Sequence, residues 1–283
     1  MNLERRVIRL FDKFPFLYSL YEKMGLKDIR NGTNHLRKEI KRRGGIVQFQ
    51  DFKMMLDGSS YMDLSLYKQF TQTGYYEKEI SLYIKNTLYP GDVFVDIGAN
   101  SGYYTLLASR IVGQQGHVYS FEPHPDTYNR LVQNIMLNSL NNVHTFNYAV
   151  SSFDGEGELF VSKSSDGLNS LKPIPLVSGH LKVGIRKLDT VIRGDVKMIK
   201  IDAEGSELDI IRGAENIISS SPELIIIYEI NRELSGQELL DSLDSLGFES
   251  FTVENGKLLH RIHEVNSLPR DTSNRVAIKS SKN

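Results

Sequence analysis

The chain has 283 residues, of which 40% are hydrophobic and 24% are charged, as in an ordinary globular protein. Its net charge of -1 lacks the basic excess of a nucleic-acid-binding protein, so we expect no DNA partner. It has no cysteine, which excludes disulfides and thiolate metal sites. No apolar run approaches the roughly 18 residues of a membrane span. Charges interrupt the N-terminus, so we expect no signal peptide and a cytoplasmic location.

The first 45 residues are basic and predict a helical extension. They hold 12 Lys and Arg against five acids. Their apolar residues between positions 3 and 24 recur at spacings of three and four, as on one face of a helix, and Pro15 interrupts this stripe. Three destinations stay open for the stripe: its own domain, a second copy of the chain, or the surface of an anionic membrane.

The main domain is expected at residues 75–283, and residues 46–74 are expected to connect it to the extension. Strand and helix patterns alternate in it, which predicts an α/β doubly wound sheet. Strands are predicted at 92–98, 117–122, 143–150, 196–202 and 223–229, and helices at 103–112, 125–138, 206–219 and 239–246. Two closing strands, 248–254 and 275–280, predict an antiparallel hairpin at one edge of the sheet.

A turn with two glycines follows the first predicted strand of this domain. Without side chains at Gly98 and Gly102, a ligand can approach the backbone closely. The second strand ends at Glu122, 20 residues after Gly102, and an acid at that tip can accept both hydroxyls of a ribose. The pattern therefore predicts a ribose-bearing cofactor, whereas a tight turn without any ligand is the simpler alternative.

The residues of the turn narrow the choice of cofactor. Asn100 stands where a dinucleotide-binding fingerprint needs its second glycine, and the Lys-Ser/Thr pair of a phosphate-binding loop is absent. Asp96 beside Gly98 suits a ligand with an amine and a sulfonium cation rather than a pyrophosphate. S-adenosylmethionine has both cations and a ribose, so we predict it as the cofactor.

Six segments carry a resemblance to a known family. They are "GYYEKEI", "GDVFVDIGANSGYYTLLAS", "FEPHPDTYNRLVQNI", "IRKLDTV", "IKIDAEGSELDIIRGA" and "LIIIYEIN", in this order along the chain. Together they resemble the FkbM family of S-adenosylmethionine-dependent methyltransferases. The resemblance implies a class I, Rossmann-like methyltransferase fold and methyl transfer, commonly to a hydroxyl of a sugar or another natural product. It also implies these cofactor contacts: the methionine end at Asp96, Gly98, Asn100 and Gly102, the ribose at Glu122, and a nearby position for Glu77.

Transfer of a methyl group to an alcohol requires a group that removes the alcohol's proton. The fourth and fifth predicted strands of the domain end at Asp202 and at Glu229 to Asn231, so these side chains are expected at one edge of the sheet. We assign catalytic roles to Asp202, Glu229 and Asn231. Two roles stay open: one carboxylate takes the proton directly, or the three side chains hold a Mg²⁺ that lowers the pKa of the hydroxyl. The metal-free role is favoured, because two carboxylates and one amide are few ligands for magnesium.

Neighbouring residues receive structural interpretations. Lys200 shares a strand face with Asp202 and is expected to form an ion pair with it. Glu204 and Glu207 are interpreted as acids that favour the start of the following helix. The polar segment 163–175 is interpreted as a loop that contacts the acceptor.

The function predicted from these observations is O-methylation of a hydroxyl on a sugar, glycan or glycosylated natural product by S-adenosylmethionine. Two alternatives stay open. The first is methylation of a peptide or an RNA, for which the basic N-terminus is the motive. The second is a non-catalytic scaffold that binds the cofactor, against which the acids Asp202 and Glu229 argue.

Overall fold

The computed structural model describes residues 28–162, 165, 167–174, 177–230, 236–264 and 274–279. The apolar stripe expected between residues 3 and 24 lies outside this range, so its contacts stay a prediction. The first described helix is α3 (Asp28–Arg42). None of the described helices combines the length and the apolar character that a membrane crossing requires.

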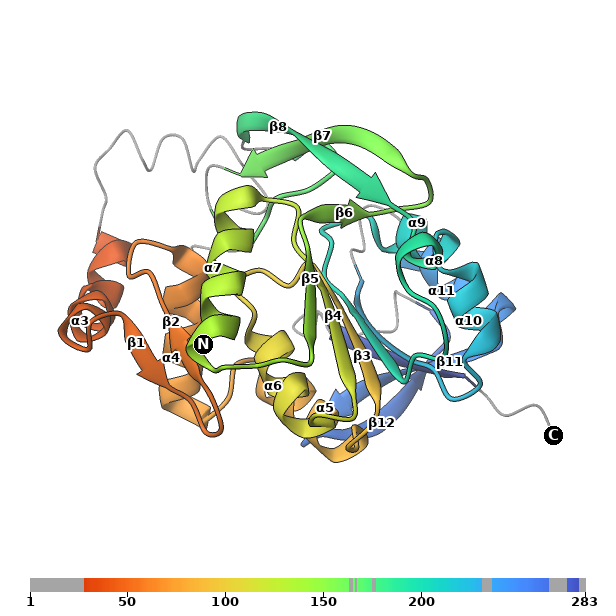
Figure 1. Cartoon of the computed structure of the whole chain (residues 1–283), viewed down its shortest axis with the longest axis horizontal. Helices are drawn as coiled ribbons and strands as arrows, with labels where there is room; N and C mark the ends of the chain where they lie inside the picture. Colours follow the sequence, from red (N-terminus) through yellow and green to blue (C-terminus); the bar gives the residue numbers. More distant parts are fainter. Residues whose placement is uncertain are drawn as a thin grey trace.

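An eight-stranded sheet forms the centre of the described chain (Figure 1). Its order is β12-β11-β13-β10-β9-β3-β4-β5, and neighbours from β5 to β10 run parallel. The strands are β3 (Val93–Ile97), β4 (His117–Phe121), β5 (Val143–Phe146), β9 (Met198–Ile201), β10 (Ile225–Glu229), β11 (Phe248–Glu254), β12 (Lys257–Ile262) and β13 (Asn274–Lys279). The antiparallel strands β13, β11 and β12 extend it at one edge, which confirms the predicted Rossmann-like class I fold.

Helices cover both faces of this sheet (Figure 1). Alternate residues of β3 point to opposite faces, so Phe94 joins one buried cluster and Val95 joins the other. The cluster around Phe94 includes residues of α5 (Lys78–Thr87), α6 (Tyr103–Val112) and α7 (Pro125–Leu137). The cluster around Val95 includes residues of α8 (Leu188–Val191), α9 (Glu207–Arg212), α10 (Glu215–Ser220) and α11 (Gly236–Ser245).

The strand order places a topological switch point between β3 and β9. From β3 the chain proceeds to β4 and β5 on one side, and it later adds β9 and β10 on the other side. The connections that follow β3 and β9 therefore leave in opposite directions. In open α/β sheets, ligands bind at the carboxyl ends of the strands at such a point.

The strand predicted at 143–150 is wrong as a single element, because the chain changes sheets at Asn147. The first half forms β5 in the main sheet, and the second half forms β6 (Tyr148–Val150) in a separate sheet with β8 (Val177–Arg186) and β7 (Gly155–Ser162). The Asn147 amide donates to the carbonyl oxygens of Glu122, at 2.8 Å, and Pro123, at 3.0 Å. These bonds tie the bend to the end of β4.

The helix predicted at 206–219 is also divided, into α9 and α10. The division lies at Gly213, where the chain passes against the backbone of Ser151. A Cβ atom on Gly213 would lie 2.1 Å from the Ser151 carbonyl oxygen. Close packing of two segments that are distant in sequence therefore interrupts a pattern that locally favours one helix.

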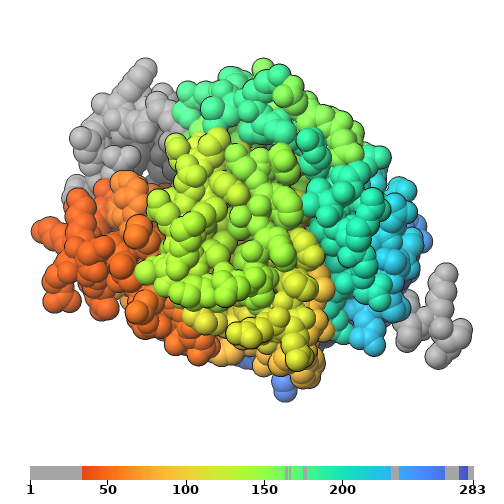
Figure 2. All heavy atoms as spheres, viewed as in Figure 1, coloured from red at the N-terminus to blue at the C-terminus, as the bar shows by residue number. Residues whose placement is uncertain are grey.

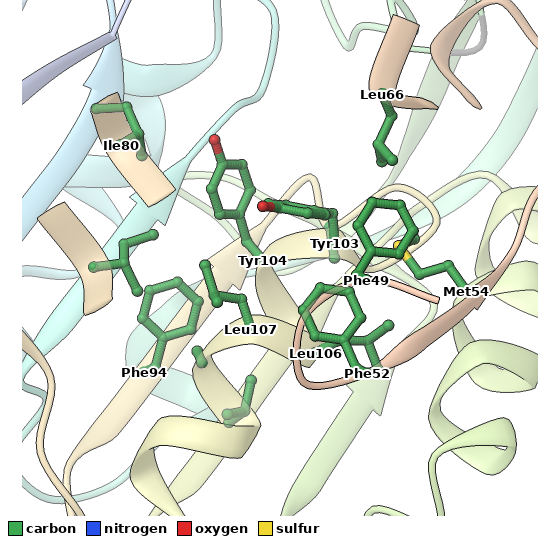
Figure 3. Close-up of a cluster of buried hydrophobic side chains, with 14 of the residues drawn as sticks. Phe49, Phe52, Met54, Leu66, Ile80, Phe94, Tyr103, Tyr104, Leu106 and Leu107 are labelled. Atoms are coloured by element: carbon green, nitrogen blue, oxygen red, sulfur yellow. The ribbon is translucent and has the colours of Figure 1, made fainter. Parts of the chain in front are cut away.

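Residues 46–74, expected as a connecting segment, form a hairpin and a helix. The hairpin pairs β1 (Ile46–Gln48) with β2 (Lys53–Met55), and α4 (Tyr61–Thr73) follows. Ser60 caps α4 by accepting from the Asp63 amide at 3.1 Å. Phe49, Met54 and Leu66 belong to the same buried cluster as Phe94. The segment packs beside α6 and α7, as Figure 2 shows from outside and Figure 3 shows in the core.

Candidate active site

The turn after β3 contacts the ends of both β4 and β9 at the switch point. Gly98 has a φ of 78°, and its amide and that of Ala99 donate to the Phe121 carbonyl oxygen at 3.0 and 2.9 Å. A Cβ atom on Gly98 would lie 1.9 Å from the Asp202 carbonyl oxygen. Position 98 therefore requires glycine both for its left-handed backbone and for the close approach of the β9 connection.

The second glycine of the turn is also required by protein packing. Gly102 has a φ of 96°, and a Cβ atom there would lie 2.5 Å from Cδ1 of Leu131 on α7. Protein atoms therefore occupy the space where side chains at these two glycines would lie, and contact of the glycine backbone with a cofactor stays a prediction. Gly98 and Asn100 line a cleft beside the turn, whereas Gly102 is not among the described residues that line it.

Glu122 is held rigidly at the end of β4. Its side chain is buried, with the residue 6% exposed. One carboxylate oxygen accepts from the Asn100 amide at 3.0 Å, and the other accepts from the His124 amide at 2.9 Å. A carboxylate has about four acceptor positions and can therefore accept from more than two donors.

The cleft beside the turn is open to solvent. Its lining comes from the main sheet, the small sheet and α4, in three groups: Ile97, Gly98, Asn100, Phe121, Glu122 and Pro123; Tyr148, Ala149, Val150, Leu159, Gly167, Asn169, Ser170 and Leu171; and Asp202, Ala203, Ser206 and Met62. Among these described residues, the charged side chains are the acids Glu122 and Asp202. The cleft therefore favours a cationic ligand over an anionic one.

Two residues expected at the cofactor are not among the described residues that line the cleft. Asp96 is buried on β3 and accepts from the Thr105 hydroxyl at 2.7 Å. Glu77 accepts from the Tyr104 hydroxyl at 2.5 Å and from the Asn274 amide at 3.2 Å. Their contacts with a cofactor stay predictions.

Lys200 lies between Asp202 of the cleft and the acids Asp96 and Glu77, whose charges act on it. It is 1% exposed, and its ammonium donates to Asp202 Oδ2 at 2.8 Å, which confirms the expected ion pair. The same ammonium lies 4.7 Å from the centre of the Tyr104 ring. Burial alone would lower the pKa of Lys200, but the carboxylates of Asp202, Glu77 and Asp96 outweigh it and raise that pKa above its ordinary value.

Three carboxylates meet at the ends of β9 and β10. The parallel register pairs Tyr228 with Ile201, so Glu229 and Asp202 come next to each other at the edge of the sheet. Carboxylate oxygens of Asp202, Glu204 and Glu229 all lie within 4.8 Å of one another. This confirms the expected convergence of Asp202 and Glu229. Asn231 lies outside the described residues, and its role stays a prediction.

Glu204 is the member of this cluster that the sequence interpretation missed. Burial, followed by the negative charges of Asp202, Glu229 and Glu207, raises the pKa of Glu204 to about 8. Its backbone has a φ of 48°, which is uncommon for a residue with a side chain. In the sequence, the neighbouring Gly205 indicates a turn at this position. That Glu204 lies close to Glu229 depends on the pairing of β9 with β10.

The other acid of this turn has the structural role expected for it. Glu207 is buried, and its carboxylate accepts from the Gly205 amide at 3.1 Å just before α9. Beside it, the hydroxyl of Ser206 is buried at the cleft with no hydrogen-bond partner among the described residues. Ser206 therefore offers a polar group to a ligand.

The loop between β7 and β8, expected to contact an acceptor, borders the same cleft. Its Ser170 hydroxyl donates to the Glu204 carbonyl oxygen at 2.7 Å, and its Lys172 pairs with Asp209 at 2.6 Å. At Gly167 it packs against Met62 of α4. The loop is thus anchored beside the carboxylate cluster.

The family of the chain follows from a match over its central part. Residues 96–250 match the model of the methyltransferase FkbM domain. The chain belongs to the FkbM methyltransferase family. This confirms the resemblance, and the matched residues include Asp96, Gly98, Glu122, Asp202 and Glu229.

Two relatives have names that describe methyltransferases. The chain is 28% identical over 138 residues to the hexuronic acid methyltransferase AglP of Haloferax volcanii, covering 48% of this chain and 55% of that protein. It is 25% identical to Methyltransferase 1 of Beauveria bassiana, covering 45% of this chain and 61% of that protein. The chain thus spans little more than half the length of each.

Two solved structures are similar to the chain over most of its length. Methyltransferase FkbM from Methylobacillus flagellatus KT is 17% identical, with a TM-score of 0.47, covering 77% of this chain and 54% of that one. The TYW2 protein of M. jannaschii in complex with AdoMet is 15% identical, with a TM-score of 0.44, covering 82% of this chain and 84% of that one.

Proposed function

We propose that the protein transfers a methyl group from S-adenosylmethionine to a hydroxyl of a sugar, a glycan or a glycosylated natural product. The observation that carries the proposal is one cleft at the switch point of an FkbM domain, lined by Glu122 at the end of β4 and by Asp202 at the end of β9. The similarity to a hexuronic acid methyltransferase supports the sugar as acceptor.

The chemistry of the cleft fits this cofactor. S-adenosylmethionine supplies an electrophilic methyl group on a sulfonium, and it carries an ammonium as well. We assign the ribose to Glu122, which lines the cleft at the end of β4, and the methionine end to the turn at Gly98 and Asn100. Phe121 and Ala149 offer apolar surface to the adenine. Cofactor contacts of Asp96, Gly102 and Glu77 stay part of the proposal.

The acceptor's proton is assigned to the carboxylates of Asp202, Glu204 and Glu229. As the acceptor oxygen bonds to the methyl carbon, the carbon–sulfur bond breaks and the proton passes to a carboxylate. Asp202 already pairs with Lys200, so its negative charge is held in place. Glu204, with a pKa of about 8, holds its own proton at neutral pH and becomes able to accept one from the acceptor as the pH approaches 8.

A bound cation is the alternative role for this cluster. Three carboxylate oxygens within 4.8 Å of one another suit Mg²⁺, which would lower the pKa of the acceptor hydroxyl. We favour direct proton transfer, because the ammonium of Lys200 already neutralises one of the three charges. Turnover that stops with a chelator and returns with Mg²⁺ would identify the metal-dependent form instead.

Calorimetry tests the cofactor. The protein is expected to bind S-adenosylmethionine and S-adenosylhomocysteine, and to show no binding of NAD. The Glu122→Ala variant loses charge-assisted bonds to the ribose, so its binding free energy should weaken by about 1.5–3 kcal/mol. Unchanged affinity in that variant, with a normal melting temperature, would contradict the assignment.

A transfer assay tests the acceptor. The protein is incubated with S-adenosylmethionine labelled in its methyl group and with separate panels of glycans, peptides and RNA. Label on a glycan hydroxyl is the expected result. Label on a peptide or an RNA would overturn the acceptor class, and cofactor binding without transfer to any panel would favour a scaffold.

A further inference from the structure

The glycine turn is also held at Ser101, by α4 from outside the matched FkbM domain and by α7 from inside it. The Ser101 hydroxyl donates to Asp63 of α4 at 3.3 Å. The Ser101 carbonyl oxygen accepts from the Asn134 amide of α7 at 2.8 Å. The turn is therefore held between the N-terminal segment and α7, immediately next to the residue that bonds Glu122.

Asp63 has the hydrogen-bond donors that a buried carboxylate needs. It is fully buried, and its other carboxylate oxygen accepts from the Asp57 amide at 2.6 Å and from Arg130 of α7 at 3.0 Å. A buried charge is tolerated only with such partners, because burial removes its hydration. Asp63 thus joins three segments: its own helix, α7 and the turn.

Aromatic packing fixes the same connection on the apolar side. The rings of Phe49 and Phe52, at the tip of the β1–β2 hairpin, lie 5.8 and 5.7 Å from the ring of Tyr103, in edge-on arrangements. Figure 3 shows both phenylalanines beside Tyr103 at the start of α6. Since Tyr103 follows Gly102, the hairpin restrains the end of the turn while Asp63 restrains its middle.

We propose that Asp63 is a positioning residue for the cofactor turn, acting through Ser101 on Asn100 and Glu122. This inference rests on the proposed function, and it makes the N-terminal segment part of the cofactor site. Asp63 is separated from the cleft by Ser101 and therefore acts without touching the cofactor.

The bonds of Asn100 explain why the turn needs this support. Asn100 has a φ of 50°, its side chain accepts from the Ser101 amide at 2.7 Å, and its own amide donates to Glu122 at 3.0 Å. A left-handed backbone in a residue with a side chain is unfavourable and persists only where its surroundings hold it. When Ser101 loses its anchor, Asn100 relaxes and the orientation of Glu122 is lost with it.

The experiment uses the full chain with single substitutions. Ser101→Ala removes the hydroxyl that reaches Asp63, and Asp63→Asn removes the charge while keeping the shape. Ser109→Ala is the matched control, because Ser109 is also a buried serine of the α6 region whose hydroxyl is hydrogen-bonded, to Asn142 at 2.6 Å, but it lies at the other end of that helix. Calorimetry measures the dissociation constant of S-adenosylhomocysteine, and hydrogen exchange measures the amides of residues 98–102 without ligand.

The dissociation constant is expected to rise by on the order of 10-fold in Asp63→Asn and about 3-fold in Ser101→Ala, with no change in Ser109→Ala. Exchange at residues 98–102 should be faster in the first two variants only. The double variant should bind no more weakly than Asp63→Asn, because the contact removed by Ser101→Ala is one of those that Asp63→Asn already alters.

Wild-type affinity and exchange in a folded Ser101→Ala variant would overturn the inference, whether or not Asp63→Asn folds. Equal losses in Ser101→Ala and Ser109→Ala would also overturn it, because they would reflect general destabilisation. A wild-type chain that binds no S-adenosylhomocysteine would overturn the proposed function. The exchange measurement, which uses no ligand, tests the Asp63–Ser101 contact independently of that outcome.

Discussion

At the residue scale, Asp202 lies between opposite charges. The buried ammonium of Lys200 contacts it on one side, and the carboxylates of Glu204 and Glu229 lie on the other. The negative charge of Asp202 is one of the causes that raise the pKa of Glu204 to about 8. One strand end thus holds an ion pair and a carboxyl group that titrates near pH 8.

Replacing Asp202 tests its proposed catalytic role. Asp202→Asn keeps the shape of the side chain and removes its charge, so we expect methyl transfer to slow by on the order of 100-fold or more, with cofactor affinity nearly unchanged. Single-turnover kinetics and calorimetry measure the two quantities. Glu223→Gln is the control, since it removes another carboxylate–lysine pair, with Lys197 at the opposite end of β9. Turnover that survives Asp202→Asn would refute the role.

Glu204 should make the stability of the fold depend on pH. The folded state keeps its proton up to a pH of about 8, whereas an unfolded glutamate loses it near 4.5. The contribution of Glu204 to stability is therefore present below pH 4.5 and is lost as the pH rises to about 8. Glutamine has no such proton, so the melting temperature of Glu204→Gln should rise relative to wild type between pH 5 and pH 8.

Thermal unfolding at several pH values measures this difference. Glu238→Gln, on the exposed side of α11, is the matched control and should follow the wild type at every pH. A difference between Glu204→Gln and wild type that does not change with pH would contradict the assignment.

At the element scale, contacts between distant segments decide where helices and strands end. The small sheet branches from the main sheet at Asn147, and the break between α9 and α10 places Gly213 on the backbone that follows β6. Both features lie beside elements that line the cleft. The end of β5 at Asn147 and the end of α9 at Gly213 therefore determine where the small sheet and its loop meet the carboxylate cluster.

Gly213 is predicted to be essential for this packing. A methyl group at Gly213→Ala would lie 2.1 Å from a backbone oxygen, which cannot move aside as a flexible side chain can. We expect the free energy of unfolding to fall by about 2–3 kcal/mol. Gly179→Ala on β8, whose added methyl group would meet nothing within 4 Å, should change it by less than about 0.5 kcal/mol. Chemical denaturation measures both, and equal values would contradict the argument.

At the scale of the whole molecule, the segment before the FkbM domain shares that domain's core. Its hairpin and α4 supply Phe49, Phe52 and Leu66 to the buried cluster that contains Phe94 and other residues of the central sheet and α6 (Figure 3). Residues 46–74 and the domain should therefore unfold together. Contact of the stripe between residues 3 and 24 with a membrane or a second chain stays a prediction.

Truncation of Phe52 tests this shared core. Phe52→Ala is expected to lower the free energy of unfolding by about 3–5 kcal/mol, in one transition seen equally by circular dichroism and tyrosine fluorescence. Phe153, which is 47% exposed, is the control, and Phe153→Ala should change stability by about 0.5 kcal/mol or less. An early separate transition in wild type or in Phe52→Ala would show that the segment folds independently.

The sequence by itself determined the parts of this protein that depend on local pattern. Alternation of apolar strands and amphipathic helices indicated the sheet, and the positions of Gly98, Glu122, Asp202 and Glu229 at strand ends indicated where a ligand would bind. These inferences succeed because parallel strands in such a fold present their carboxyl ends on one edge. The family motifs, which are contiguous in sequence, added the class of reaction.

Only the tertiary structure decided which side chains face the cleft and which lie behind it. Asp96 and Glu77 are in the motif region but turn toward the Lys200 network, whereas Glu204 comes to the site from what reads as a helix start. Asp63 reaches the glycine turn across 38 positions of sequence. Such contacts depend on strand register and on packing between distant segments, and no local periodicity records them.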